Sequence, residues 1–124
     1  MNKVFIKGNL VKDIDIRMTP SETKIGRFVV ATKRNVKNKD GNYDSDFISC
    51  VAFDNNADFI SKHFSKGSGI LLEGNIRTGS YEKDGERVYT TDVVVERVEF
   101  IDKKEKQSDP FEDMGNKVAT ELPF

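Results

Sequence analysis

The sequence predicts one all-β domain followed by a short tail. Val and Ile together number 21, whereas Leu and Ala together number 8, and branched side chains favour the pleated surface of a sheet over a helix. Val, Ile, Leu and Phe account for 34 of the 124 residues, which exceeds the ~20% below which chains tend to remain disordered. At 124 residues, the chain suits a single domain of ordinary size.

Six apolar or alternating segments, separated by polar or turn-forming residues, are predicted as strands. In chain order these are Val4 to Val11, Ile14 to Arg17, Ile25 to Thr32, Asp46 to Phe53, Gly69 to Ile76 and Val88 to Phe100. Gly8 and Gly26 lie inside two of them, and glycine within a strand often marks a bulge or a barrel corner.

One helix is predicted after the fourth strand. Phe59, Ile60, His63 and Phe64 fall on one helical face. Asp54 or Asn55 can cap its N-terminus, and Gly67 suits the position just after its C-terminus.

Two polar loops join the longer strands. Residues 35–44 contain Asp40-Gly41, and residues 82–86 contain Asp84-Gly85; Asp-Gly is a strong hairpin turn signal. Two long hairpins with a helix between the third and fourth main strands fit a five-stranded Greek-key barrel of the OB type. We therefore expect an OB domain over residues 1–101.

The tail, residues 102–124, has no apolar periodicity at its start and is expected to be flexible. Residues 1–101 carry a net charge of +1 and residues 102–124 carry −2, which sum to the net −1 of the chain. The last four residues, Glu121, Leu122, Pro123 and Phe124, form a mildly acidic, apolar tip, which is predicted to be a docking peptide.

Aromatic and cationic side chains lie close together in the predicted sheet. Phe47 and Phe53 share one face of their strand, whose other face is also apolar, so this strand is either buried on both sides or an open platform. Tyr81 and Arg77 stand near the second hairpin. The run from Lys33 to Lys39 has four cations and no acid; it is either a solvated face or, beside aromatic rings, a surface for an unpaired nucleic acid strand.

The sequence offers little for catalysis or metal binding. Cys50 and His63 are the only residues of their types, which excludes an intramolecular disulfide and leaves a metal site or a catalytic triad little to build on. The lone cysteine and the absence of an apparent signal peptide or membrane span favour the cytoplasm. We expect no enzyme activity, no cofactor and no metal.

The motifs, taken in order, resemble those of the bacterial single-stranded DNA-binding protein family in its Firmicutes-like form, whether from a host, a phage or a plasmid. The matching segments are residues 2–10, 16–20, 28–32, 46–53, 66–68, 73–78, 89–95 and 122–124. Val36 stands where the family often has tryptophan, which this chain lacks entirely.

The resemblance implies an OB-fold homotetramer that wraps single-stranded DNA near the nucleoid. It maps base stacking onto Phe47, Phe53 and Tyr81. Cationic contacts map onto Arg17, Lys33, Arg34, Lys37, Lys66 and Arg77. The tip would recruit replication, recombination and repair proteins. The alternative is an OB-fold protein-interaction adaptor without DNA binding, because a fold alone does not determine function.

Overall fold

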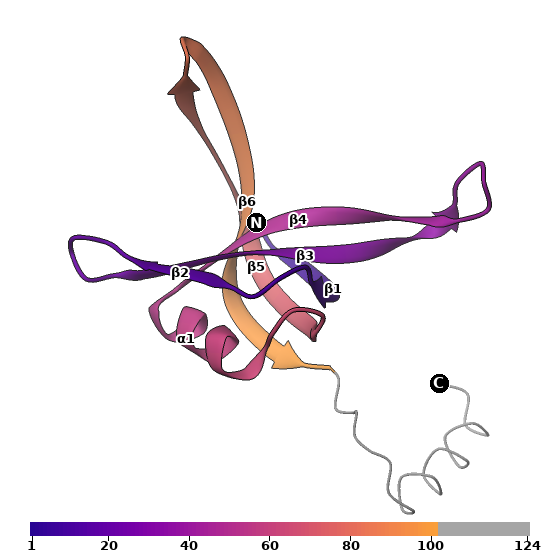
Figure 1. The fold of residues 1–124 in the computed structure, drawn as a ribbon, viewed down its shortest axis with the longest axis horizontal. Coiled ribbons are helices and arrows are strands. Elements are labelled where there is room, and N and C mark those ends of the chain that lie inside the picture. The colour runs from indigo at the N-terminus through magenta and orange to yellow at the C-terminus, as the bar shows by residue number, and fades with distance from the viewer. Residues whose placement is uncertain (102–124) are drawn as a thin grey trace, which may run out of the picture.

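A computed structural model describes residues 1–101, which form six strands and one helix (Figure 1). The elements in chain order are β1 (Val4–Leu10), β2 (Asp15–Met18), β3 (Lys24–Lys37), β4 (Tyr43–Phe53), α1 (Asp54–His63), β5 (Gly69–Lys83) and β6 (Glu86–Phe100). The predicted flexible tail and its docking tip lie outside the described residues.

Five strands close into a barrel. The ring runs β1–β5–β6–β4–β3 and returns to β1, because β1 pairs with β5 along most of its length and with β3 at its end. The β4–β6 pairing is parallel and the others are antiparallel. The short β2 extends the sheet by pairing with the start of β3. The predicted five-stranded OB barrel, with its helix between the third and fourth barrel strands, is confirmed.

Glycines permit close backbone contact at two corners of this ring. Gly8 lies where β1 passes from β5 to β3, and a Cβ there would come within 2.3 Å of the Ala31 carbonyl oxygen. Gly74 follows a register shift in β5, and a Cβ there would come within 2.2 Å of the Val94 carbonyl oxygen. The prediction that a strand glycine marks a corner therefore holds at Gly8.

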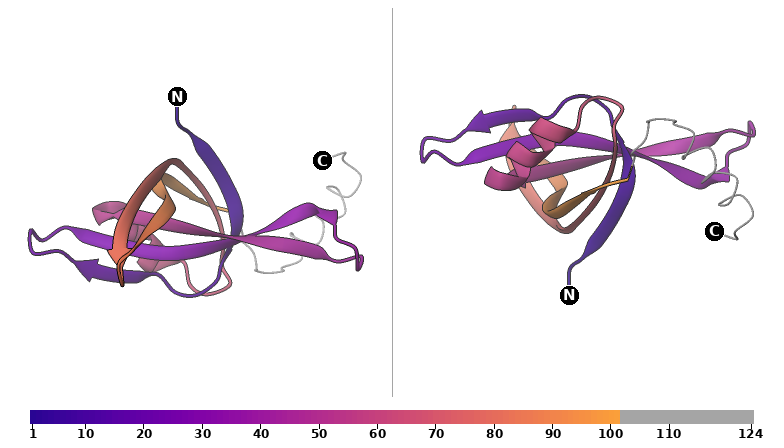
Figure 2. Two further views of the ribbon diagram at one scale, coloured as in Figure 1. Left: turned by 90° about the horizontal axis from the view of Figure 1, so that it is seen from above. Right: turned by 90° about the horizontal axis from the view of Figure 1, so that it is seen from below.

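The core fills the barrel, and α1 packs at one end of it (Figures 1 and 2). Alternate residues of β4 settle which face points inward: Cys50 and Ala52 are buried in the core cluster with Phe28 and Ile60. Val51 points to the other face, yet it is only 5% exposed. The described chain itself therefore covers this part of the outer face of β4.

The ends of α1 differ from the prediction. The chain passes from β4 into α1 without a linker, so Phe53 occupies the N-cap and no side chain caps the helix. The Asp54 carboxylate accepts a hydrogen bond from the Lys24 backbone N–H at 3.1 Å instead. Phe64 is the C-cap, and Gly67, with φ of 90°, serves the following turn. The predicted caps at Asp54 or Asn55 and at Gly67 were wrong.

Two hairpins extend well beyond the barrel and diverge from it (Figure 1). Strand β3 continues to Lys37 and β4 begins at Tyr43, so much of the predicted loop 35–44 is strand. The turn that remains is held by Asn38, whose side-chain oxygen accepts the N–H groups of Asp40 and Asn42 at 2.8 and 3.0 Å. Apolar alternation could not predict this extension, because both faces of the arm are exposed.

Candidate nucleic-acid interface

The outward face of β4 forms the base of a continuous surface. Alternation places Tyr43, Ser45, Phe47, Ser49, Val51 and Phe53 on this face. Opposite them on β3, in register and in the same order, are Lys37, Lys33, Ala31, Val29, Arg27 and Ile25. We call these two rows, together with Arg17 and Asp15 of β2, the platform; Arg17 lies opposite Ile25, and Asp15 lies opposite Arg27.

Phe47 is an open ring on the platform. Its partner across the ladder is Ala31, whose methyl group is too small to cover a phenyl ring, and Phe47 is 66% exposed. Phe53 is half-buried beside Ile25, with Arg17 in the next strand. Both rings thus lie on the surface and have a cationic residue on the same face.

The β5–β6 hairpin continues the same face. Val51 of β4 is in register with Val94 of β6, and Val94 is in register with Asn75 of β5. Alternate residues of β5 after Asn75 lie on the same face as Asn75, and they include Arg77 and Tyr81. Tyr81 is 51% exposed. The register therefore brings Tyr81 and Arg77 to the platform side of the sheet.

The two hairpins form arms on either side of the position where β4 meets β6. Those strands pair only at Cys50–Val93 and Val51–Val94, and beyond these pairs the arms separate (Figure 1). Val51 and Val94 are 5% and 9% exposed, so the base of the surface is closed and apolar. The exposed rings and cations lie on the arms around it.

Tyr43 is a site residue that the sequence interpretation missed. It is 46% exposed, and the ammonium groups of Lys33 and Lys37 each lie 5.8 Å from its ring centroid. Arg27, exposed on the platform beside Val51, was also missed. The same alternation that places Phe47 and Phe53 on one face extends to Tyr43, but Tyr43 falls within the predicted loop 35–44.

Two predicted contacts are not brought to the platform. Arg34 makes a bidentate ion pair with Asp46, at 2.8 and 3.1 Å, and Asp46 points to the opposite face of β4 from Phe47. The hydrogen bond from Arg34 holds the pKa of Asp46 below its ordinary value. Lys66 lies in the turn after α1, where its backbone N–H donates to Asp13 at 2.8 Å.

A polar cleft adjoins the platform where β1 meets β3. Its volume is about 550 Å³, and Lys7, Lys33 and Ser45 are among its lining residues. Lys7 projects outward between the inward-facing Ile6 and Gly8. The cleft therefore adds Lys7, another cation that the sequence interpretation did not select, beside Lys33 of the platform.

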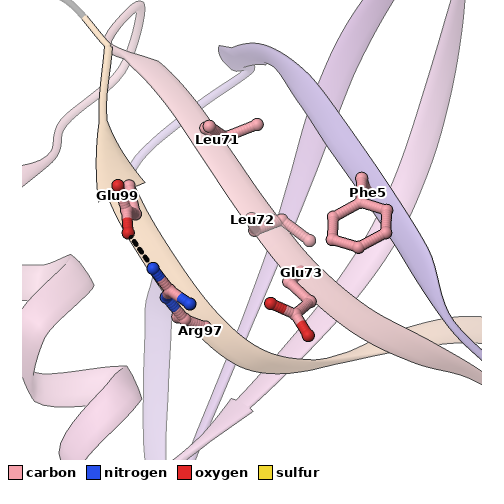
Figure 3. A pocket seen from close by; sticks show the side chains of 6 residues that line it. All are labelled: Phe5, Leu71, Leu72, Glu73, Arg97 and Glu99. Atoms are coloured by element: carbon pink, nitrogen blue, oxygen red, sulfur yellow. Dashed lines mark hydrogen bonds and ion pairs between the residues drawn. The ribbon is translucent and has the colours of Figure 1, made fainter.

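A second cleft, of about 240 Å³, lies on the outer face of β1, β5 and β6 (Figure 3). Phe5, 71% exposed, lies opposite Glu73 in the β1–β5 ladder, Leu71 also lines the cleft, and Arg97 binds Glu99 at its edge. Next to it, Lys3 contacts Glu73 at 3.0 Å and Glu96 at 2.5 Å, and hydrogen bonds, chiefly to Glu96, raise the pKa of Lys3. This face combines an exposed ring with paired charges and is separate from the platform.

Two features of the described residues bear on metal binding and on thiol reactivity. Within residues 1–101, no three His, Cys, Asp or Glu side chains are grouped so as to hold a metal ion. Burial, with a smaller contribution from Asp92, raises the pKa of the Cys50 thiol to about 12, so Cys50 is a poor nucleophile. No helix in that range is long and apolar enough to cross a bilayer.

The model of the single-strand binding protein family matches residues 1–101 of this chain, which include the whole barrel. The chain belongs to the single-strand binding protein family. Its relatives include Firmicutes proteins, as the resemblance predicted.

Three similar proteins illustrate the range of the family. A single-stranded DNA-binding protein of Clostridium perfringens is 49% identical over 104 residues, covering 82% of this chain and 67% of its own length. Single-stranded DNA-binding protein 1 of Streptococcus pyogenes is 37% identical and covers 100% of this chain and 99% of its own. Single-stranded DNA-binding protein 1 of Staphylococcus aureus is 35% identical, covering 93% and 74%.

Proposed function

We propose that this protein binds single-stranded DNA without sequence preference and protects it during replication, recombination and repair. Membership of the family supports single-stranded DNA as the ligand, and the names of the relatives agree with that ligand. The observation that carries the proposal is that Phe47 and Tyr81 are open to solvent and Phe53 is half open, all on one face with cations. Flat exposed rings accept any base, so such a surface tolerates sequence.

The binding mechanism divides between rings and cations. Bases stack on Phe47, Phe53 and Tyr81, and each stack is worth about 1–3 kcal/mol. Phosphates meet Arg17, Lys33, Lys37 and Arg77, and the counterions they displace make binding favourable at low salt. Because Arg34 is paired with Asp46, it stabilises the arm and contributes less positive charge to the DNA contact than the other cations do. No step of this mechanism breaks or forms a covalent bond.

Titration of labelled oligo-dT at several salt concentrations tests this function. We expect the logarithm of the binding constant to fall linearly with the logarithm of salt, with a slope of about −0.7 per phosphate neutralised. Replacing both Phe53 and Tyr81 by Ala should weaken binding while the fold persists, because neither ring belongs to the core cluster. An adaptor without DNA binding would show no salt-sensitive affinity for oligo-dT in the parent protein.

We also propose that the chain assembles as a homotetramer. The cleft lined by the exposed Phe5 and by Leu71 (Figure 3) is the described surface best suited to a subunit contact. The Lys3 ion pairs lie next to it, and exposed apolar patches rimmed by charge mark interaction sites. Sedimentation at micromolar concentration should give the tetramer mass. Phe5→Glu should lower that mass, and a monomeric parent protein would contradict the assembly.

The tip, Glu121 to Phe124, is proposed to recruit replication, recombination and repair proteins in the cytoplasm, at the nucleoid. The net −2 of residues 102–124 also suggests competition with DNA for the cations of the platform. Deleting residues 109–124 should then tighten DNA binding, most visibly at low salt. Unchanged affinity at low salt would contradict the competition, and retained partner binding by the deletion would contradict recruitment through the tip.

A further inference from the structure

The end of the β3–β4 arm carries an exposed ring, Tyr43, that is not among the stacking residues Phe47, Phe53 and Tyr81 described above. We propose that Tyr43, with Lys33 and Lys37, is an additional nucleotide-binding position, where a base stacks on the Tyr43 ring and its phosphate meets the lysines. This inference rests on the proposed single-stranded DNA binding and extends it outward along the arm.

Tyr43 lies on the same face as the predicted stacking residues. It precedes Phe47 by four residues on β4, and even spacing keeps the two rings on one side of the strand. At ~3.3 Å per residue the two Cα atoms lie about 13 Å apart along the strand. Tyr43 is 46% exposed, so part of its ring is open to a ligand. A strand of DNA on Phe47 that follows β4 outward would therefore meet Tyr43 next.

The two lysines supply positive charge at the ring. Each ammonium lies 5.8 Å from the Tyr43 centroid, which is near the ~6 Å outer limit of a cation–π contact. Among residues 1–101, no carboxylate is within ion-pair distance of either ammonium. Both ammonium groups are thus available to a phosphate, and the flexible lysine side chains can turn from the ring toward it.

Polar contacts within the arm link its two strands and its turn. Arg34 and Asp46 form a bidentate pair across its two strands, and the Asn38 side chain both binds the turn and donates to Asp44 at 3.0 Å. These bonds hold the backbone on either side of Tyr43 in place. Because the backbone is already held in place, less conformational entropy is lost when a base stacks on Tyr43. This favours a defined nucleotide-binding position on the arm.

Tyrosine fluorescence provides a direct test, because the chain has three tyrosines and no tryptophan. The double variant Tyr81→Phe/Tyr89→Phe leaves Tyr43 as the only tyrosine and keeps a ring at Tyr81. We expect saturating oligo-dT to quench its emission. The matched control Tyr43→Phe/Tyr81→Phe leaves only Tyr89, which is 77% exposed and in register with Ser80 on the opposite face of the hairpin, and its emission should not change.

Affinity measurements complete the test. Tyr43→Ala should weaken binding of oligo-dT about five- to tenfold, the lower part of the range for one stacked base, whereas Tyr43→Phe should bind within about twofold of the parent. Replacing Lys33 and Lys37 by Gln should make the plot of log binding constant against log salt concentration less steep by about 1.4. This is about 0.7 for each of the two lost phosphate contacts.

The outcomes separate this inference from the function on which it rests. Unquenched Tyr43 emission while oligo-dT still binds would overturn the Tyr43 position and leave single-stranded DNA binding intact. Absence of any binding by the parent protein would overturn both. Three results together would establish the position: quenching of Tyr43 emission, loss of oligo-dT affinity in Tyr43→Ala, and near-parent affinity in Tyr43→Phe.

Discussion

Replacing Phe47 by Ala should weaken DNA binding strongly and alter the fold little. The ring is 66% exposed, so about a third of it is covered by the protein. Full burial of a Phe side chain is worth about 1.5–3 kcal/mol, and a third of that is roughly 0.5–1 kcal/mol of folding stability. Loss of one stacked base removes about 1–3 kcal/mol of binding, which corresponds to a five- to 150-fold rise in Kd at ~1.4 kcal/mol per factor of ten.

Anisotropy of labelled oligo-dT, measured across salt concentrations, would show the loss. Because Phe47 contacts no phosphate in the proposed mechanism, the affinity should fall by the same factor at every salt concentration, and the slope should stay constant. Thermal unfolding of the same variant should shift by only a few degrees, since ~1 kcal/mol changes the Tm of such a domain by about 4–8 °C.

The control is Tyr89→Ala, which removes an aromatic side chain that is 77% exposed on the opposite face of the β5–β6 hairpin. We expect its DNA affinity to match that of the parent. The stacking mechanism would be refuted by a folded Phe47→Ala protein that binds within twofold of the parent, or by a loss that appears only at low salt.

Three further predictions follow from other parts of the structure. Arg77→Ala should reduce the salt slope by about 0.7, and an unchanged slope in the oligo-dT titration would remove Arg77 from the DNA path. Gly74→Ala should destabilise the fold by about 1–3 kcal/mol, measured by urea unfolding, because its Cβ would lie 2.2 Å from a backbone oxygen; Gly79→Ala, whose Cβ would have its nearest contact at 3.3 Å, is the matched control. Burial raises the pKa of the Cys50 thiol from 9.0 to about 12, so the native state holds the thiol proton more tightly than the unfolded state does. The resulting stabilisation of the native state is complete below pH ~9 and is lost as the pH rises toward 12. Urea unfolding across this range should show a steeper loss of stability in the parent than in Cys50→Ala, and equal losses would contradict the shift.

Much of the barrel could be predicted because its determinants are local. Alternation and branched residues indicated the strands, and Asp84-Gly85 indicated the second hairpin turn, where both residues have positive φ. Gly8 was predicted as a corner because glycine is scarce within strands unless two backbones approach closely. The helix also followed from its apolar spacing, but its caps did not, because β4 leads directly into α1 and Phe53 occupies the N-cap.

The sequence by itself determined the order of the elements, the OB barrel and the aromatic and cationic residue types available for binding. Tertiary structure decided which face of β4 is closed, how far the hairpins extend, and that Arg34 is paired with Asp46 while Tyr43 joins Lys33 and Lys37. The physical reason is that alternation assigns residues to two faces without saying which face is covered. That choice depends on contacts between strands far apart in the chain, such as the parallel pairing of Val51 with Val94.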